Sequence, residues 1–477
     1  MKRLLLTTSA VLCTLMPLAA QTGEWALERC PAPIWAQPGE VLRLNLTGPE
    51  GGSGKVSLGR VTTPLVRSGD GFSGRVEAPT SGKGALKVVD GLGKSFELGA
   101  VEVASGVKTL TVTSPLVTRQ GPDSDYERLT PLVPGTVVEV DGRRGDWYRS
   151  AASGVWLDGR SGQISEGAAP SSALSGIKIR RDENGDARLV LDCGVRPEAR
   201  VELEGDGVLR LTLPATDDLV FDVTKEADAA NFLGPVTVRP LTPGGVVVEV
   251  ALGEQGIGGY ELSAGEKPGE LELRVRQPVP KSLSGLIVTL DAGHGGPKDP
   301  GTVGHGGLPE KVLNLRVTEV LERMLRERGA TVLMTRTSDA DVAPDDEGAS
   351  HELQARVDMS VEKQAHLFLS LHHNARPSLE EGKISHGTDI YWYQPFSEPL
   401  GRALADPIAD AIGEPLRTSR FRSFHVIRQT FSPSVLIEFQ YLSNPGLEKS
   451  VLDRPDYPER AAGGVVRGLE AYLKALP

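Results

Sequence analysis

The residues best suited to chemistry lie in the C-terminal part of this 477-residue chain, which holds all eight of its histidines. The apolar runs 286–290 and 367–371 lead into His294 and His372, and Glu310 lies between the two in the sequence. Two imidazoles and one carboxylate are a suitable donor set for a catalytic Zn²⁺ site, which needs three protein ligands and an open position for water. The sequence therefore predicts a zinc site formed by these three residues.

A further glutamate, Glu438, lies within the apolar run 435–442, which should be largely buried. An unpaired buried carboxylate costs several kcal/mol, so it needs either a partner or a function. A glutamate beside the metal is suited to take the proton of the attacking water. Glu438 is therefore a candidate for this base.

Each of these residues also has an ordinary structural explanation. A histidine after a strand is often only a turn residue, and a glutamate early in a helix is usually a capping or dipole residue. Two other histidines are weaker candidates for the metal. His373 should face the side of its strand opposite to His372, and His305 lies in a glycine-rich loop, where we expect it at the rim.

The elements that must position these side chains alternate between strand and helix. Apolar residues recur at helical spacing between Pro309 and Gly329, and a second helix is predicted over 353–365. This alternation predicts a C-terminal α/β domain, residues 284–477, with a mostly parallel sheet covered by helices. Ligands of such sheets bind beyond the carboxyl ends of the strands. His294 and His372 should therefore point into one crevice.

The preceding residues favour short strands and turns, as do the 56 glycines and 34 prolines of the chain. Alternating apolar residues predict three all-β modules, at 21–105, 107–166 and 174–278, and the first of these is a β-sandwich of unknown role. The fold class is therefore multidomain, with N-terminal all-β modules followed by the C-terminal α/β domain.

The N-terminus has a short basic start, an apolar stretch over 4–18 and small residues before Gln21. This pattern predicts a signal peptide at 1–20, an extracytoplasmic location (periplasm or cell envelope) and no stable membrane insertion after cleavage. Cys30 and Cys193 then remain, and whether they pair is left open. The net charge of −11 argues against nucleic acid as a partner.

Five motifs occur in order between about residues 286 and 475. They are D-x-G-H-G-G (Asp291 to Gly296), G-x-x-G followed by Glu310-Lys311 (Gly301 to Gly304), T-R-x-x-D (Thr335 to Asp339), F-x-S-x-H-x-N (Phe368 to Asn374) and E-x-x-[FY]-[LI]-S-N (Glu438 to Asn444). Together they resemble the zinc-dependent N-acetylmuramoyl-L-alanine amidase family of the amidase_3 type. The resemblance implies that His294, Glu310 and His372 bind zinc and that Glu438 is the catalytic glutamate.

Two upstream modules also resemble known families. Residues 107–166 are similar to the bacterial SH3-like barrel through an R-x-G-P turn, a P-G-T-x-V-x-V strand and the Trp147-Tyr148 pair. Residues 174–278 resemble the AMIN domain, a β-sandwich that often precedes wall amidases.

The resemblance of the C-terminal domain implies an exported enzyme that cleaves the amide between N-acetylmuramic acid and L-alanine in peptidoglycan, for cell-wall remodelling or daughter-cell separation. Peptidoglycan is then the expected partner, and a protein activator is left open. Two alternatives are a catalytically inactive peptidoglycan-binding protein and a zinc peptidase acting on wall stem peptides.

Overall fold

The computed structural model describes residues 25–28, 33–69, 71–104, 106–204, 207–226, 231–242, 244–343, 348–375 and 385–477. The predicted signal peptide and Cys30 lie outside these residues. Cys193 is buried as a free thiol, so the pairing with Cys30 stays a prediction. Among the described residues, no helix is both long and apolar enough to cross a bilayer.

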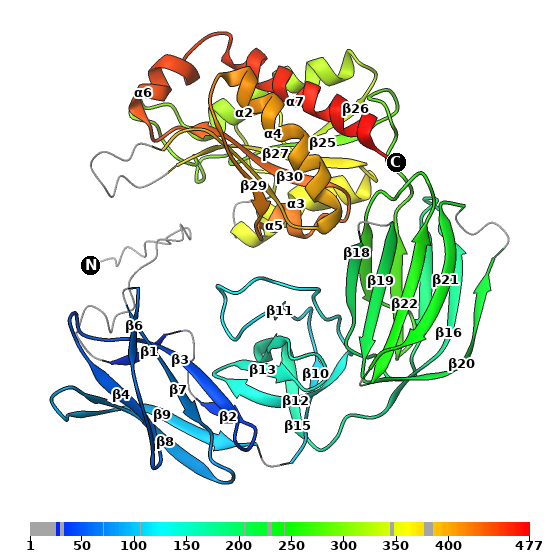
Figure 1. Ribbon diagram of the computed structural model, residues 1–477. Coiled ribbons are helices and arrows are strands. Elements are labelled where there is room, and N and C mark those ends of the chain that lie inside the picture. Colours follow the sequence, from blue (N-terminus) through cyan, green and yellow to red (C-terminus); the bar gives the residue numbers. More distant parts are fainter. Residues whose placement is uncertain are drawn as a thin grey trace, which may run out of the picture.

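The first two β units share one sheet (Figure 1). The N-terminal β unit has a four-stranded sheet of β1 (Ala26–Glu28), β3 (Val41–Thr47), β7 (Gly71–Glu77) and β6 (Val66–Ser68). It also contributes β2 (Ile34–Ala36), β4 (Gly54–Leu58), β5 (Val61–Pro64), β8 (Lys83–Asp90) and β9 (Ser95–Val103) to a larger sheet. The short strand β2 pairs with both β9 and β12, and so joins this unit to the next.

The middle β unit continues that sheet around a small core of its own. Its strands are β10 (Lys108–Val112), β11 (Thr118–Arg119), β12 (Val137–Arg144), β13 (Trp147–Ser150), β14 (Trp156–Asp158) and β15 (Gly162–Glu166). A short 3₁₀ helix, η1 (Gly159–Ser161), precedes β15. Trp147 and Trp156 are both buried, so their side chains pack within the unit.

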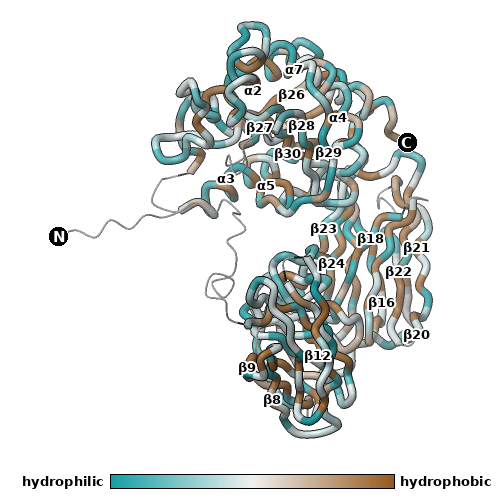
Figure 2. Tube along the Cα trace, turned by 60° about the vertical axis from the view of Figure 1, so that its left-hand side comes forward, coloured by the Kyte–Doolittle hydropathy of each residue, from teal (hydrophilic) through white to brown (hydrophobic). Residues whose placement is uncertain are grey.

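The third β unit, residues 172–275, is called the sandwich unit here. It packs two sheets against each other around one apolar core. One sheet holds β20 (Thr216–Lys225), β16 (Ser172–Arg181), β17 (Ala187–Asp192), β24 (Glu270–Val275) and β23 (Tyr260–Ala264). The other holds β18 (Arg200–Glu204), β19 (Val208–Pro214), β22 (Gly245–Leu252) and β21 (Leu233–Pro240). Hydrophobic stretches lie along these strands (Figure 2), which matches the predicted alternation.

The C-terminal unit contains a six-stranded sheet in the order β26, β25, β27, β30, β28, β29. These strands are β26 (Thr331–Met334), β25 (Ile287–Ala292), β27 (Leu367–Asn374), β30 (Ser434–Tyr441), β28 (Thr388–Trp392) and β29 (Leu416–Phe421). β28 runs antiparallel to β30, and the other neighbouring pairs are parallel. The predicted order of N-terminal β units followed by a unit of helices and sheet is confirmed.

Helices cover both faces of this sheet. On one face α2 (Glu310–Arg326), α4 (Glu398–Ile412) and α7 (Tyr457–Ala475) pack on the larger core. On the other face α3 (Ala349–Glu362) and α5 (His425–Arg428) cover a smaller core. Short helical turns complete the unit at η2 (Pro395–Ser397), α6 (Pro445–Leu447) and η3 (Glu448–Leu452).

Two helix boundaries differ from the predicted ones. The helical pattern, which favours Pro309 as the first helical residue, starts one residue early: Pro309 lies just before α2, and Glu310 begins the helix. α3 begins at Ala349, four residues before the predicted start at Leu353. Its first turn, residues 349–352, contains one small apolar residue, and therefore carries no apolar repeat from which the start could be predicted.

Candidate metal centre

His294 is held in a sharp turn just beyond β25. It has a left-handed backbone conformation with φ of +60°, which is uncommon for a residue with a side chain. A Cβ atom on the preceding Gly293 would lie 2.1 Å from the ring of His372, so glycine is required for the two histidines to approach. Asp299 in the following loop lies with its Oδ1 2.8 Å from His294 Nδ1.

Glu310 begins α2 and is almost fully buried, with 4% of its surface exposed. Its Oε2 accepts a hydrogen bond from the backbone N–H of Thr302, and its Oε1 accepts one from the N–H of His373. The side chain of Asn314, one helical turn along α2, also donates to Oε1. These donors fix the carboxylate at the helix N-terminus, where the helix dipole favours negative charge.

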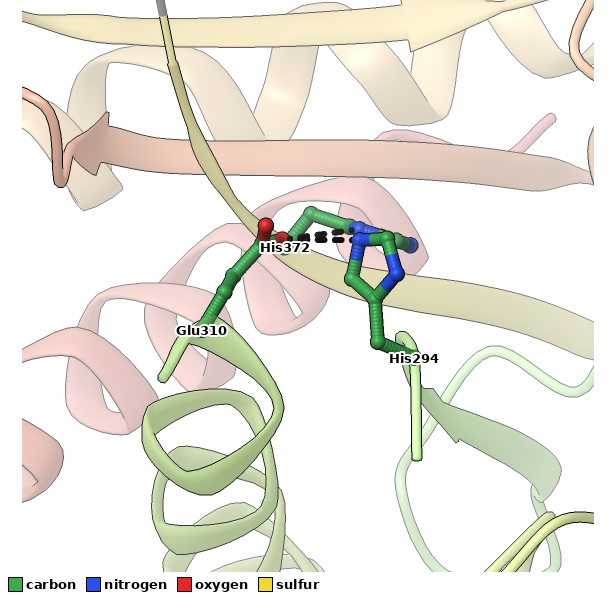
Figure 3. A group of neighbouring side chains, drawn as sticks. All are labelled: His294, Glu310 and His372. Carbon is green, nitrogen blue, oxygen red and sulfur yellow. Dashed lines mark hydrogen bonds and ion pairs between the residues drawn. The ribbon is translucent and has the colours of Figure 1, made fainter. Parts of the chain in front are cut away.

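The three predicted ligands meet near the carboxyl ends of β25 and β27 (Figure 3). Glu310 Oε1 lies 3.3 Å from His294 Nε2 and 3.1 Å from His372 Nδ1. The two imidazole rings stand nearly perpendicular to each other, with centroids 4.9 Å apart. One ligand atom from each residue lies within 4.8 Å of the others, so the set can hold a single metal ion.

The electrostatics of the metal-free site show how closely these groups interact. Burial alone would raise the pKa of Glu310, but hydrogen bonds and charge from His294 and His372 hold it well below its usual value. Burial alone would lower the pKa of His294, but Asp299 and Glu310 together raise it to about 10. The carboxylates of Asp299 and Glu310 therefore favour positive charge at this position, which is the sign of charge that a metal ion carries.

Glu438 lies beside the three candidate ligands, on the neighbouring strand. It is the direct register partner of His372 in the β27–β30 pair, so both side chains project from the same face of the sheet. Its Oε2 is buried and has no hydrogen-bond partner among the described residues. Burial, followed by the charge of Glu310, raises the pKa of Glu438 well above its usual value. A carboxyl group in this environment is suited to proton transfer.

The other two histidine predictions agree with the geometry. His373 points away from the cluster and is buried, with Nδ1 2.7 Å from Asn314 Oδ1 and Nε2 2.8 Å from the Tyr457 hydroxyl. His305 is exposed in the loop before α2. Neither contributes to the cluster of candidate ligands.

A buried ion pair beneath the site explains several of the motifs. Asp291 Oδ1 accepts hydrogen bonds from Arg356 and Thr335, and its Oδ2 accepts one from Ser370. Arg356 also donates to the backbone carbonyl of His294. The first, third and fourth motifs therefore meet at one carboxylate, which anchors the His294 turn to the sheet.

Sequence reasoning did not find Arg356, Asp299 or Asn314. Arg356 lies on a helix, where an arginine usually faces solvent, and here it is buried with 3% exposed. Asp299 lies in a loop without periodic pattern. The one available signal for Asn314 was its spacing of four residues from Glu310, which places both on one face of α2.

Replacing Arg356 with methionine should destabilise the C-terminal unit by about 3–5 kcal/mol, because Asp291 would be left buried without its charge partner. The check is hydrogen exchange of the β25 and β27 amides in the full chain, which reports the local free energy of opening. The matched control is Arg323→Met, which removes an exposed pair with Glu327 and should change that free energy by less than about 0.5 kcal/mol. Equal effects of the two substitutions would refute the anchoring role.

Comparison with known proteins shows relatives of the C-terminal unit. Residues 288–471 match the family described as N-acetylmuramoyl-L-alanine amidase (Amidase_3). The germination-specific N-acetylmuramoyl-L-alanine amidase of Bacillus subtilis (strain 168) is 34% identical over 201 residues, which are 40% of this chain and 81% of the relative. A probable cell wall amidase, LytH, of Staphylococcus saprophyticus is 30% identical over 200 residues, covering 42% of this chain and 62% of the relative.

Among solved structures, the catalytic domain of CwlV, an amidase from Bacillus (Paenibacillus) polymyxa var. colistinus, is 33% identical. It aligns over 39% of this chain and 98% of that domain with a TM-score of 0.35. The sequence matches define the class of the protein as a peptidoglycan amidase. The chain belongs to the N-acetylmuramoyl-L-alanine amidase family, and the predicted enzyme class is confirmed.

Proposed function

We propose that the chain is an exported, zinc-dependent amidase that cleaves the bond between N-acetylmuramic acid and L-alanine in peptidoglycan. His294, Glu310 and His372 hold the metal, and Glu438 is the catalytic residue. The observation that carries the proposal is the convergence of one carboxylate and two imidazoles beside the buried carboxyl group of Glu438, whose Oε2 has no hydrogen-bond partner in the described part of the chain.

The residues fit a zinc ion in both chemistry and space. Nitrogen and oxygen donors in a set of three are typical of catalytic zinc sites. Glycines line the cluster where side chains would obstruct it. A Cβ on Gly301 would lie 2.6 Å from Glu310 Oε2 and 2.7 Å from the His294 ring.

The residues around the metal position have different roles in hydrolysis. When bound, zinc supplies a Lewis acid that polarises the scissile carbonyl and acidifies the attacking water. Glu438 takes the proton of that water and returns it to the leaving amine nitrogen, so its raised pKa suits both steps. Asp299 accepts a hydrogen bond from His294 Nδ1, which leaves the Nε2 lone pair directed at Glu310 and the metal position.

Replacing Asp299 with asparagine should weaken zinc binding about 10–100-fold, because His294 loses the carboxylate that orients its ring and raises its basicity. Competition with a metal-binding dye measures this affinity in the full chain. Asp358→Asn, an exposed change on α3, is the control and should leave it unaltered. Unchanged zinc affinity in Asp299→Asn would show that Asp299 does not orient the ligand.

Digestion of purified sacculi tests the reaction itself. The proposed amidase releases free stem peptides and leaves the glycan strands intact, which mass spectrometry of the products identifies. Clipped stem peptides would instead indicate a zinc peptidase, and no products would indicate an inactive peptidoglycan-binding protein.

The upstream units and the location belong to the same proposal. Export by the predicted signal peptide would bring the enzyme to its substrate in the cell envelope, and relatives named as cell wall amidases support such a location. An SH3-like role for the middle β unit and an AMIN-like role for the sandwich unit would direct the catalytic unit to the wall. Sacculus binding by the full chain carrying Glu438→Gln tests this, because association is then measured without turnover.

A further inference from the structure

Three units meet around a cavity of about 530 Å³. The middle β unit contributes residues 115–117 and 128–131, and the sandwich unit contributes 200–203 and 260–262. The C-terminal unit supplies the remaining wall, which includes the end of β28 and part of α5. A cavity of this size lies within the range of sites that bind small ligands, about 300–1,000 Å³.

The cavity is separate from the candidate metal centre. Trp392, in its wall, follows Asp389 by three residues on β28, a distance of about 10 Å along an extended strand. Asp389 is the register partner of the catalytic candidate Glu438. β28 runs antiparallel to β30, so the end of β28 lies beside the start of β30. The cavity is therefore at the end of the sheet opposite to the metal centre.

The wall of the cavity combines apolar and aromatic surface with three arginines and two glutamates. Arg200 and Glu202 of the sandwich unit pair with each other, and Glu261 of the same unit also lines the cavity. Tyr260, Trp392 and Phe421 contribute rings to it. Arg128 comes from the middle β unit, and Arg428 comes from the end of α5 in the C-terminal unit. Folding therefore brings together two guanidinium groups that are far apart in the sequence.

Within the described ranges, neither Arg128 nor Arg428 forms an ion pair with a carboxylate. The Arg428 side chain donates only to the carbonyl and hydroxyl of Ser423 and contacts His425. Burial, then the charge of Arg128, lowers the pKa of Arg428 to about 10. Like charges held together in a partly buried site cost free energy, which an anion bound between them would offset.

The same excess of positive charge acts on the neighbouring groups. Burial lowers the pKa of His425, and the charges of Arg428 and Arg128 lower it further. A third arginine, Arg119, is the bridge partner of Arg128 and is itself buried. Because Glu202 and Glu261 also line the wall, the cavity combines guanidinium and carboxylate groups with apolar surface. This combination suits a small molecule that carries carboxylates, amines and aliphatic groups.

We propose that this cavity binds a short peptide with free carboxylate and amino groups, the stem peptide released from peptidoglycan, with Arg128 and Arg428 receiving its carboxylates. The choice of peptide rests on the proposed function, because the proposed hydrolysis supplies a product with free carboxylates and small aliphatic side chains. A peptide bound there contacts all three units and thereby favours their observed arrangement.

Calorimetric titration of the full chain with synthetic L-alanyl-γ-D-glutamyl-L-lysine tests the site. We expect saturable binding that weakens at least about tenfold in Arg128→Gln and in Arg428→Gln, since each loses a charge-assisted hydrogen bond. Arg128→Lys should retain more affinity than Arg128→Gln because it keeps the charge. Arg323→Gln, on the exposed face of α2, is the matched control and should bind like the wild type.

A second arm uses only the wild-type chain and so does not depend on how the variants fold. The same peptide with its carboxyl groups converted to amides should bind at least about tenfold more weakly than the form with free carboxylates. Absence of binding to the wild type, equal affinity for both peptides, or equal affinity in all variants would overturn the proposal. These titrations involve no turnover, so their failure is distinct from a failure of the proposed hydrolysis, which the sacculus products decide.

Discussion

Replacing Glu438 with glutamine is expected to slow amide hydrolysis by at least about a hundredfold, while the zinc content stays at the wild-type level. General acid–base catalysis contributes about 10²–10⁴-fold to the rate, and glutamine keeps the shape of the side chain but cannot take a proton. Zinc is retained because Glu438 is not part of the cluster of candidate ligands. Release of stem peptide from sacculi, measured beside zinc content, checks both parts.

The same role of Glu438 also predicts how kcat/KM changes with pH. The base must be deprotonated, so kcat/KM of the wild type should fall as pH decreases through the pKa of Glu438, which burial and Glu310 raise. That acidic limb should disappear from the residual activity of Glu438→Gln. Glu398→Gln, on the first turn of α4, serves as the control. Loss of zinc from Glu438→Gln would instead make Glu438 a ligand, and an unchanged rate would place the base elsewhere.

Replacing His294 with alanine is expected to remove both zinc and activity. Two ligands would remain where a catalytic zinc site uses three. The metal supplies several kcal/mol of transition-state stabilisation, so the rate should fall by at least about a thousandfold. Metal analysis after exhaustive dialysis, together with the sacculus assay, measures the two losses.

His305→Ala is the matched control for His294→Ala. His305 is a histidine of the same loop region, exposed and outside the cluster, so its loss should leave zinc and activity near wild-type values. If His294→Ala retained zinc, or if both variants lost it alike, the assigned ligand set would be wrong.

The candidate ligands could be predicted because each lies at a recognisable boundary between elements. His294 follows an apolar strand through glycine, His372 lies near the end of another strand, and Glu310 begins a long amphipathic helix. In α/β folds these boundaries meet at the carboxyl ends of the strands. Local patterns are therefore enough to predict that the three residues lie together.

The supporting contacts could not be predicted in this way. Arg356 reaches Asp291 across 65 residues of sequence, and nothing in a helical repeat distinguishes a buried arginine from an exposed one. The three-residue strand β2 is too short to show alternation, yet it joins two β units predicted as separate modules. The cavity between the three units depends on how they dock, and no local pattern encodes that.

The most direct test of the proposed metal centre is the activity of the full chain on sacculi before and after removal of its metal. We expect about one zinc ion per purified chain, loss of stem-peptide release after thorough chelation, and recovery on adding back one equivalent of zinc. Hydrolysis at the full rate by a chain shown to be free of metal would contradict the proposal that His294, Glu310 and His372 act by holding zinc.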